Sequence, residues 1–182
     1  MNKIKLHLGC GKRKAKGFIN IDIQKYDSVN IVSDILDLPF KNNSIDLIYT
    51  CSTIEHFDRK KWKNVLKYWY DLLKDDGELQ LSTLNFDAIC NRYKKYYNIE
   101  EIVGILLGGS KDFTDRHGMI FDYAILGHEM QNIGFKNVRK CDWKEFEPYV
   151  IDRDYDDFAR AYLPHMDFDN GDLMMLNMIG VK

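Results

Sequence analysis

Short runs of apolar and β-branched residues recur along the first half of this 182-residue chain. Their nearly uninterrupted apolar character is typical of strands that are buried on both faces of a sheet. These runs predict strands at Ile4–Leu8, Phe18–Ile23, Val29–Ser33, Ile45–Thr50 and Glu78–Thr83. Two later runs, Asn137–Cys141 and Leu173–Val181, add two strands and complete a predicted seven-stranded sheet.

A predicted helix lies between the fourth and fifth predicted strands. Apolar residues from Trp62 to Leu73 recur at helical spacing, opposite a face that carries lysines. Asp58 is placed to cap the start of this helix, and Gly77 follows its end. A strand, a crossover helix and a second strand form a right-handed parallel unit. Further helices are predicted at Phe86–Tyr97, Ile99–Leu107 and Asp122–Ile133.

The connections between the first three predicted strands are short. Lys12–Gly17 and Gln24–Ser28 leave no room for a crossover helix, although an extended chain spans up to ~3.3–3.6 Å per residue. The pattern therefore predicts an α/β fold with a Rossmann-like, open, mostly parallel seven-stranded sheet whose first crossover helices are shortened or absent. Without these helices, the apolar surface of the first strands needs another cover. We expect either a late loop of this chain or a second subunit in a homodimer to supply it.

Composition narrows the class of protein. Hydrophobic residues make up 45% and charged residues 30% of the chain, as in soluble globular proteins, and we expect a single domain over residues 1–182. A net charge of −2 gives no global field toward nucleic acid or anionic lipid, so neither is an expected partner. No apolar run suits a signal or a membrane span. Four scattered cysteines without a Cys-x-x-Cys pair favour a reducing cytoplasm over a zinc site or disulfides.

The first functional signal lies where the first strand ends, in the run Leu-His-Leu-Gly-Cys-Gly. Gly9 and Gly11 allow a sharp turn and a close approach of the backbone to a ligand, which a Cβ would prevent. Asp22 ends the next strand, where its carboxylate can accept both hydroxyls of a ribose. Gly-x-Gly alone occurs in many turns, but with the downstream motifs it indicates an adenosine-containing cofactor.

These motifs resemble, in order, those of the class I S-adenosylmethionine-dependent methyltransferases. The turn at Leu8–Gly11 is similar to their glycine turn and Asp22 to their ribose-binding acid. The stretch Ser33–Phe40 resembles their adenine-binding segment, and Ser44–Phe57 their fourth-strand motif with its Glu-His tail. The resemblance covers nearly the whole chain and is closest to a small bacterial subgroup found among glycan-biosynthesis genes. It implies S-adenosylmethionine held by Leu8, Gly9, Cys10, Gly11, Asp22, Ile23, Asp34, Ile35, Leu36, Thr50 and His56.

Some positions depart from that family or allow a second interpretation. His7 stands where the family usually has an acid that helps to hold the methionyl amino group. Asp34 either accepts a hydrogen bond from the adenine amino group or caps a turn. The full Gly-x-Gly-x-x-Gly is absent, and Gly17 comes too late to complete it, which disfavours a dehydrogenase.

The resemblance implies methyl transfer to the hydroxyl of a small molecule or of a sugar or glycan precursor. Alternatives are N- or O-methylation of a small amine, phospho-alcohol or natural product, and a non-catalytic cofactor-binding partner subunit. The base candidates are His117, then His165, then His56, because imidazole titrates near neutral pH. Glu55 is a candidate for substrate contact. A related Glu-His tail accompanies a divalent metal in ubiquinone-pathway O-methyltransferases, but Ser52 replaces the further acid here, so no metal is predicted.

Two other segments bear on the acceptor. Residues 142–172 form a long acidic and aromatic stretch, which we interpret as a lid-like insertion over the acceptor. A basic cluster of Lys12, Arg13, Lys14 and Lys16 is either a solvated loop or a contact for an anionic acceptor such as a nucleotide-sugar.

Overall fold

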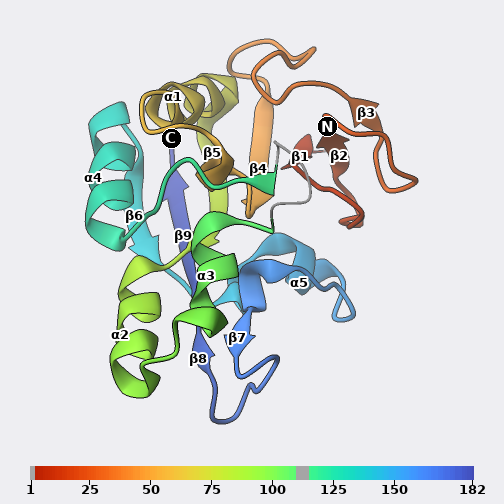
Figure 1. Cartoon of the computed structure of the whole chain (residues 1–182). Helices are drawn as coiled ribbons and strands as arrows, with labels where there is room; N and C mark the ends of the chain where they lie inside the picture. Colours follow the sequence, from red (N-terminus) through yellow and green to blue (C-terminus); the bar gives the residue numbers. More distant parts are fainter. Residues whose placement is uncertain (1–2, 110–114) are drawn as a thin grey trace.

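The computed structural model describes residues 3–109 and 115–182. At its centre lies one sheet with strands β1 (Lys5–Leu8), β2 (Ile19–Asp22), β3 (Ile31–Val32), β4 (Ile45–Cys51), β5 (Leu73–Leu84), β6 (Lys136–Lys140) and β9 (Met175–Val181). The seven strands lie in the order β3-β2-β1-β4-β5-β9-β6 (Figure 1). Strands β1 to β5 pair in parallel, whereas β9 is antiparallel to β5 and β6. The predicted fold class is confirmed.

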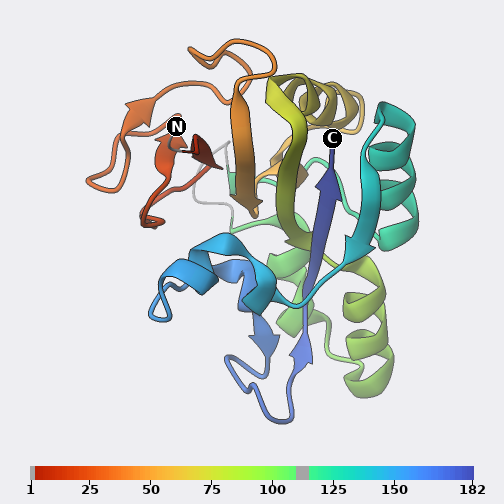
Figure 2. The same ribbon diagram turned by 180° about the vertical axis from the view of Figure 1, so that it is seen from behind.

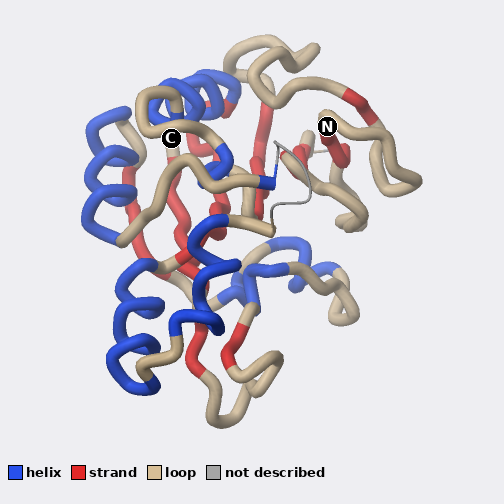
Figure 3. Tube along the Cα trace, viewed as in Figure 1, coloured by secondary structure: helices blue, strands red, loops and turns tan. Residues whose placement is uncertain are grey.

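The helices lie close to their predicted positions (Figure 3). They are α1 (Trp62–Leu72), α2 (Phe86–Tyr96), α3 (Ile99–Leu107) and α4 (Tyr123–Ile133). A further short helix, α5 (Glu147–Ile151), lies within residues 142–172, where the sequence pattern predicts no helix. Short 3-10 turns form η1 (Ile54–His56), η3 (Trp143–Glu145) and η4 (Phe158–Arg160), and a small hairpin pairs β7 (Tyr162–Leu163) with β8 (Asp172–Leu173). None of the helices formed by residues 3–109 and 115–182 is long and apolar enough to cross a membrane.

The predicted ends of α1 are wrong. The helix begins at Trp62, and Asp58 instead accepts hydrogen bonds from backbone amides two and three residues later, before the helix starts. β5 follows the helix directly, because Leu73 already pairs with Ile45 of β4. Gly77 therefore lies inside a strand and does not terminate the helix.

Alternation along β4 separates two cores on opposite faces of the sheet. Ile45 and Ile48 pack with the apolar side of α1, where Trp62 and Trp69 are buried. Leu47 and the alternate residues after it face the other side. This alternation is what a strand covered on both faces requires.

The second face has an unusual cover. Residues 9–44, all of them described, contain no helix, as the short connections predict. The segment from η3 to η4 lies on that face instead (Figure 2). Phe146, Tyr149 and Ala159 of this segment are buried against β4 and β9. A late segment of the chain thus supplies much of the missing cover, while the homodimer stays a prediction.

A buried carboxylate fastens this segment to the sheet. Asp157 is 5% exposed and accepts hydrogen bonds from the hydroxyls of Tyr49 at 2.5 Å, Tyr149 at 2.6 Å and Tyr155 at 2.9 Å. The backbone N–H of Ala159 donates to it at 2.8 Å. Burial, and after it the charge of Asp157, raises the pKa of all three tyrosines, so they keep the protons that they donate.

A third, smaller core lies beyond the carboxyl ends of the strands. We call α2, α3 and the β7–β8 hairpin the cap. Its apolar side chains pack with Leu84 and Met175 of the sheet. The cap extends away from the sheet on the side where α5 and the end of β4 lie (Figure 1).

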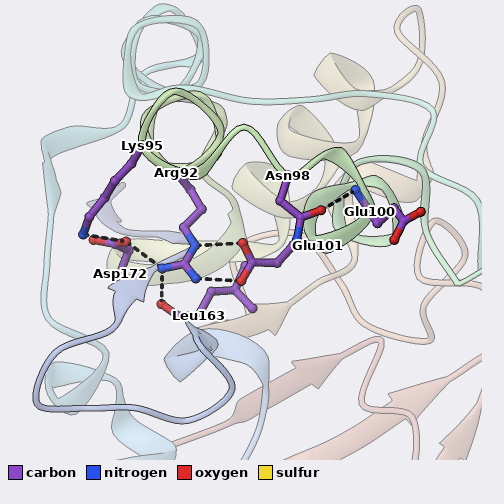
Figure 4. A network of polar contacts seen from close by, with 7 residues as sticks. All are labelled: Arg92, Lys95, Asn98, Glu100, Glu101, Leu163 and Asp172. Atoms are coloured by element: carbon purple, nitrogen blue, oxygen red, sulfur yellow. Dashed lines mark hydrogen bonds and ion pairs between the residues drawn. The ribbon is translucent and has the colours of Figure 1, made fainter.

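Arg92 of α2 joins the parts of the cap (Figure 4). Its guanidinium donates to both carboxylate oxygens of Glu101, at 3.0 and 2.6 Å, which ties α2 to α3. Its Nη1 donates at 3.0 Å to the Leu163 carbonyl of β7 and at 3.0 Å to the Asp172 carboxylate of β8. A planar guanidinium suits such a junction, because its donors have a fixed geometry.

Candidate functional site

A cavity of about 500 Å³ opens where β1, β2 and β4 end. In open α/β sheets this edge is where ligands bind. The Gly9–Gly11 turn forms one wall, Asp22 and Asp34 lie along it, and Ser52 and His56 follow the end of β4. The glycine turn and both acids therefore converge on one space, as the sequence predicts.

The glycine turn has a conformation that other residues rarely adopt. Gly9 has a φ of +67°, and a Cβ there would lie 2.3 Å from Thr53 Oγ1. Gly11 has a φ of +53°, and its N–H donates to Asp22 Oδ2 at 2.7 Å. The turn is thus closed against the loop after β4 and fixed to the end of β2, leaving backbone as the cavity wall.

The two acids are also fixed by backbone groups. Asp22 Oδ1 accepts from the Gln24 N–H at 2.8 Å, so each carboxylate oxygen has one backbone donor and keeps a lone pair. Asp34 Oδ1 accepts from the Leu36 N–H at 2.9 Å. Asp34 thus caps a turn and lines the cavity at the same time, so its two interpretations are compatible.

Not every predicted cofactor residue lines this cavity. Gly9, Gly11, Asp22, Ile23, Asp34, Ile35 and His56 do, whereas Leu8, Cys10, Leu36 and Thr50 do not. The Thr50 hydroxyl donates to the Leu8 carbonyl at 3.1 Å and ties β4 to β1. Burial raises the pKa of the Cys10 thiol to about 12, which makes a thiolate role unfavourable.

Further residues line this cavity that the resemblance did not assign to the cofactor, although three of them lie within the Ser44–Phe57 motif. They are Gln24, Tyr26, Ser52, Thr53, Phe57 and Asp115. Most directly follow a strand end, so the rule that ligands bind at the carboxyl edge of the sheet would have suggested them. Asp115 reaches the cavity from a distant loop, and nothing local in the sequence signals that.

His7 is not part of the cavity wall. Its side chain is buried on the second face of the sheet, with its ring centre 5.1 Å from that of Tyr49 and its Nδ1 3.1 Å from Asn20 Oδ1. Burial lowers the pKa of His7, so the neutral form is favoured. His7 therefore does not take over the role of the acid that the family usually has at this position, which is to help hold the methionyl amino group.

The residues present fit an adenosyl group. Carboxylates at two neighbouring strand ends can accept from ribose hydroxyls and an amino group, and the glycine turn allows close contact. No helix follows the turn, although a dinucleotide pyrophosphate would normally bind at such a helix N-terminus. The donor set thus suits a phosphate-free adenosine derivative.

A second cavity of about 530 Å³ adjoins the first. Ser52, His56 and Asp115 line both, so the two spaces meet at these side chains. Glu55 and His117 line the second cavity, together with His165 from the exposed loop between β7 and β8. All three predicted catalytic side chains therefore border one space.

His56 and His117 form a ring pair near this junction. Their ring centres are 4.9 Å apart and their planes meet at 72°. His56 Nδ1 lies 3.2 Å from the Arg116 carbonyl and donates a hydrogen bond to it. Burial, followed by the charge of His56, lowers the pKa of His117. A neutral imidazole is the form that can accept a proton.

Glu55 is fully buried in the wall of the second cavity. The Thr83 hydroxyl donates to Oε2 at 2.9 Å, while Oε1 has no hydrogen-bond partner among residues 3–109 and 115–182. Burial raises the pKa of Glu55, against the opposing effects of nearby backbone amides, His56 and Thr83. An unpartnered buried oxygen is costly and suggests that a ligand supplies the missing donor.

The basic cluster beside the turn is largely engaged within the protein. Arg13 lies with its guanidinium 4.3 Å from the Phe158 ring centre, and its Nε donates to the Asp156 carbonyl at 3.1 Å. Lys16 pairs with Asp152 at 2.8 Å. In the part of the chain that the structure describes, no group of three His, Cys, Asp or Glu side chains is arranged to hold a metal ion.

The comparisons with known proteins agree with this geometry. Residues 10–81 match the family described as "Methyltransferase domain", a span that contains most of the first cavity's wall. No curated protein matches the sequence.

Several solved structures share the fold. A SAM-dependent methyltransferase from Archaeoglobus fulgidus is 15% identical with a TM-score of 0.60, over 99% of this chain and 86% of that one. A Thermotoga maritima protein described as a possible histamine N-methyltransferase is 16% identical with a TM-score of 0.57, over 98% and 82%. Phosphoethanolamine N-methyltransferase 2 from Haemonchus contortus, in complex with S-adenosyl-L-methionine, is 13% identical with a TM-score of 0.56, over 100% and 49%.

At such identities the structures establish the fold alone, and the family match covers residues 10–81, which is less than half of the chain. The fold is that of the class I methyltransferases, and the match over residues 10–81 together with the first cavity supports S-adenosylmethionine as the cofactor.

Proposed function

We propose that the enzyme transfers a methyl group to a small-molecule acceptor bound in the second cavity. The observation that carries this proposal is the junction of the two cavities at Ser52, His56 and Asp115. Among the described residues only these three line both cavities, so a methyl donor in the first would meet a nucleophile in the second at this junction. The resemblance adds a sugar or glycan-precursor hydroxyl as the expected acceptor, with an amine as the alternative.

In this proposal the first cavity binds and orients the cofactor. Asp22 would hold the ribose hydroxyls and Asp34 the adenine amino group, and the backbone of the glycine turn would lie against the ligand beside Asp22. When bound, S-adenosylmethionine supplies an electrophilic methyl carbon. The protein then has to align the nucleophile with that carbon and exclude water, which contributes up to ~7–11 kcal/mol in the best intramolecular cases.

His117 is the proposed base. It lies in the second cavity beside His56, and its lowered pKa keeps it neutral around neutral pH. It would accept the proton that a hydroxyl or ammonium acceptor loses. His165 lies on the same cavity and is the second candidate. Residues 142–172 contribute Asp156 to Met166 to the wall, which supports a role of this insertion in acceptor binding.

The test is to measure cofactor binding and turnover separately. Calorimetric titration of S-adenosylmethionine should give one site per chain in the wild type, with affinity weakened by about tenfold or more in Asp22→Asn. Asp75→Asn, an exposed acid outside both cavities, is the control and should bind normally.

Release of S-adenosylhomocysteine with a panel of alcohols, amines and nucleotide-sugars then tests catalysis. Binding without turnover on any acceptor would favour the non-catalytic partner subunit instead. Binding of NAD but not of S-adenosylmethionine would overturn the proposal.

A further inference from the structure

The second cavity has an uneven charge distribution. Its wall includes the acids Glu55, Asp115, Asp156 and Asp157, whereas Arg13 is the one arginine or lysine among the described residues that line it. Arg160, outside the wall, pairs with the Asp156 carboxylate at 3.0 Å, so the asymmetry rests chiefly on the buried acids Glu55 and Asp157. Arg13 is already engaged with the Phe158 ring and the Asp156 carbonyl. The cavity therefore favours a cationic guest over an anionic one.

The buried acid Asp157 strengthens this asymmetry. Three tyrosine hydroxyls and one backbone N–H donate to it. It takes part in no ion pair with the lysines and arginines of the described chain. Neutral donors satisfy its hydrogen bonds without cancelling its charge, so a negative potential reaches the cavity that it lines.

The remaining wall is apolar and aromatic. Leu84, Ile105 and Met175 contribute aliphatic or thioether surface, and Phe158 and Tyr162 contribute rings. A volume of about 530 Å³ lies in the range of small-molecule sites. Such walls suit an acceptor with an apolar or aromatic body better than a fully hydroxylated sugar.

Glu55 then provides the specific contact. It is 0% exposed, it lines the cavity, and its Oε1 has no hydrogen-bond partner in the described structure, while Thr83 holds Oε2. An ammonium or amine N–H would supply the missing donor, and a charge-assisted bond of this kind is stronger than a neutral one. A phosphate would instead place like charges together.

We propose that the acceptor is an amine on an apolar or aromatic body, with its nitrogen hydrogen-bonded to Glu55 Oε1. This inference rests on the proposed methyl transfer in the second cavity and favours its alternative acceptor, an amine, over the sugar hydroxyl. An ammonium acceptor gives one proton to His117, the proposed base, while another of its N–H groups stays hydrogen-bonded to Glu55 Oε1, and the freed nitrogen lone pair forms the bond to the methyl carbon. The bond between that carbon and sulfur breaks, its electron pair remains on sulfur, and the product leaves as the N-methylated ammonium.

The experiment uses two matched probe pairs, tryptamine with tryptophol and tyramine with tyrosol. Within each pair the aromatic body is the same, and one molecule carries an amine where the other carries a hydroxyl. Binding to the full-length protein saturated with S-adenosylhomocysteine is measured by calorimetry at neutral pH. We expect the amine of at least one pair to bind about tenfold or more tightly than its alcohol. Labelled methyl transfer should follow the same order.

Glu55→Gln tests the assigned contact. It should remove the preference for the amine, while Glu100→Gln, an exposed acid of α3 outside the cavity, should keep it. Because burial raises the pKa of Glu55, its ionisation opposes folding at neutral pH, and Glu55→Gln should not lower the melting temperature. A loss of selectivity in a stable variant therefore reports on the contact and not on folding.

The inference fails if alcohols bind the wild type as tightly as amines, or if neither member of either pair binds. It also fails if Glu55→Gln keeps the full preference. The proposed function fails separately, if S-adenosylhomocysteine does not bind. Selective amine binding to protein without that ligand would then still support the amine site.

Discussion

The cofactor half and the acceptor half of this protein are built in different ways. The first cavity draws most of its wall from residues 9–57, where short loops join β1 to β2 and β2 to β3, and a longer one leads from β3 to β4. The second cavity combines the loop after β4 with the cap, the η4 turn and the start of β9. The first is local in the sequence and fixed by backbone geometry, whereas the second is assembled from distant segments.

Because of this difference, the two halves should tolerate different amino-acid substitutions. The cofactor half depends on positive φ angles and on carboxylates held by backbone amides, which allow few substitutions. The acceptor half depends on side chains supplied by the cap and by residues 142–172, which can vary without disturbing the sheet. Mutations in the two halves should therefore separate cofactor affinity from acceptor turnover.

The largest expected effect is on chemistry in the acceptor half. His117→Asn should lower the rate of methyl transfer by ~10²–10⁴ if His117 is the base, because the proton acceptor is lost. The affinity for S-adenosylmethionine should not change, since His117 does not line the first cavity. The exposed His128→Asn is the control. Rates for His117→Asn that match this control would assign the base elsewhere.

The next effect belongs to the cofactor half. Gly9→Ala should weaken cofactor binding by about 5–150-fold, equivalent to the strain of about 1–3 kcal/mol expected for a non-glycine residue at a rare φ. Contact between the new Cβ and Thr53 adds to this strain. Gly104→Ala, in α3 with open space around its position, should bind the cofactor normally. Titration calorimetry of both variants checks the contrast, and equal affinities would show that the turn does not hold the ligand.

A smaller effect is expected from the cap alone. Arg92→Lys keeps the charge but loses the paired donors to Glu101, so α3 and the hairpin should be held less firmly. We expect the acceptor KM to rise by about tenfold with an unchanged cofactor Kd. Lys94→Met, on the exposed side of α2, should leave both constants unchanged. Parallel losses in cofactor and acceptor binding would mean that the cap is not a separate unit.

The smallest effect concerns stability against pH. Burial lowers the pKa of His7 and of His117, so the unfolded chain binds more protons than the folded one below the ordinary histidine value of about 6.5. The free energy of unfolding should therefore fall as the pH falls below that value. His7→Gln should make this dependence less steep, and the exposed His128→Gln should not. Urea unfolding at a series of pH values measures the slopes, and identical slopes would exclude a contribution from His7.

The same contrast explains how much of the molecule could be predicted from the sequence. The strands and the turn with Asp22 and Asp34 follow from local patterns and from the strand-end rule. The ends of α1 could not be found locally, because pairing of Leu73 with β4 overrides the helix-stop signal of Gly77. Such tertiary effects lie outside what propensities describe.

The arrangement of the acceptor half could not be predicted from the sequence for a related reason. The hydrogen bond between Tyr49 and Asp157 joins residues 108 positions apart, and that between Arg92 and Asp172 joins residues 80 apart. No local motif reports such contacts. The sequence nominated Glu55, His117 and His165 separately, and only the fold brings them to one cavity.

We propose that the glycine turn and the two strand-end acids hold one adenosyl group whose reactive end meets the second cavity. A crystal structure of the complex with S-adenosylhomocysteine is the decisive measurement. In that complex the ribose hydroxyls should lie on Asp22, the adenine beside Asp34, and the sulfur at the junction of Ser52, His56 and Asp115. A ligand bound away from Asp22, or one whose sulfur points away from that junction, would contradict it.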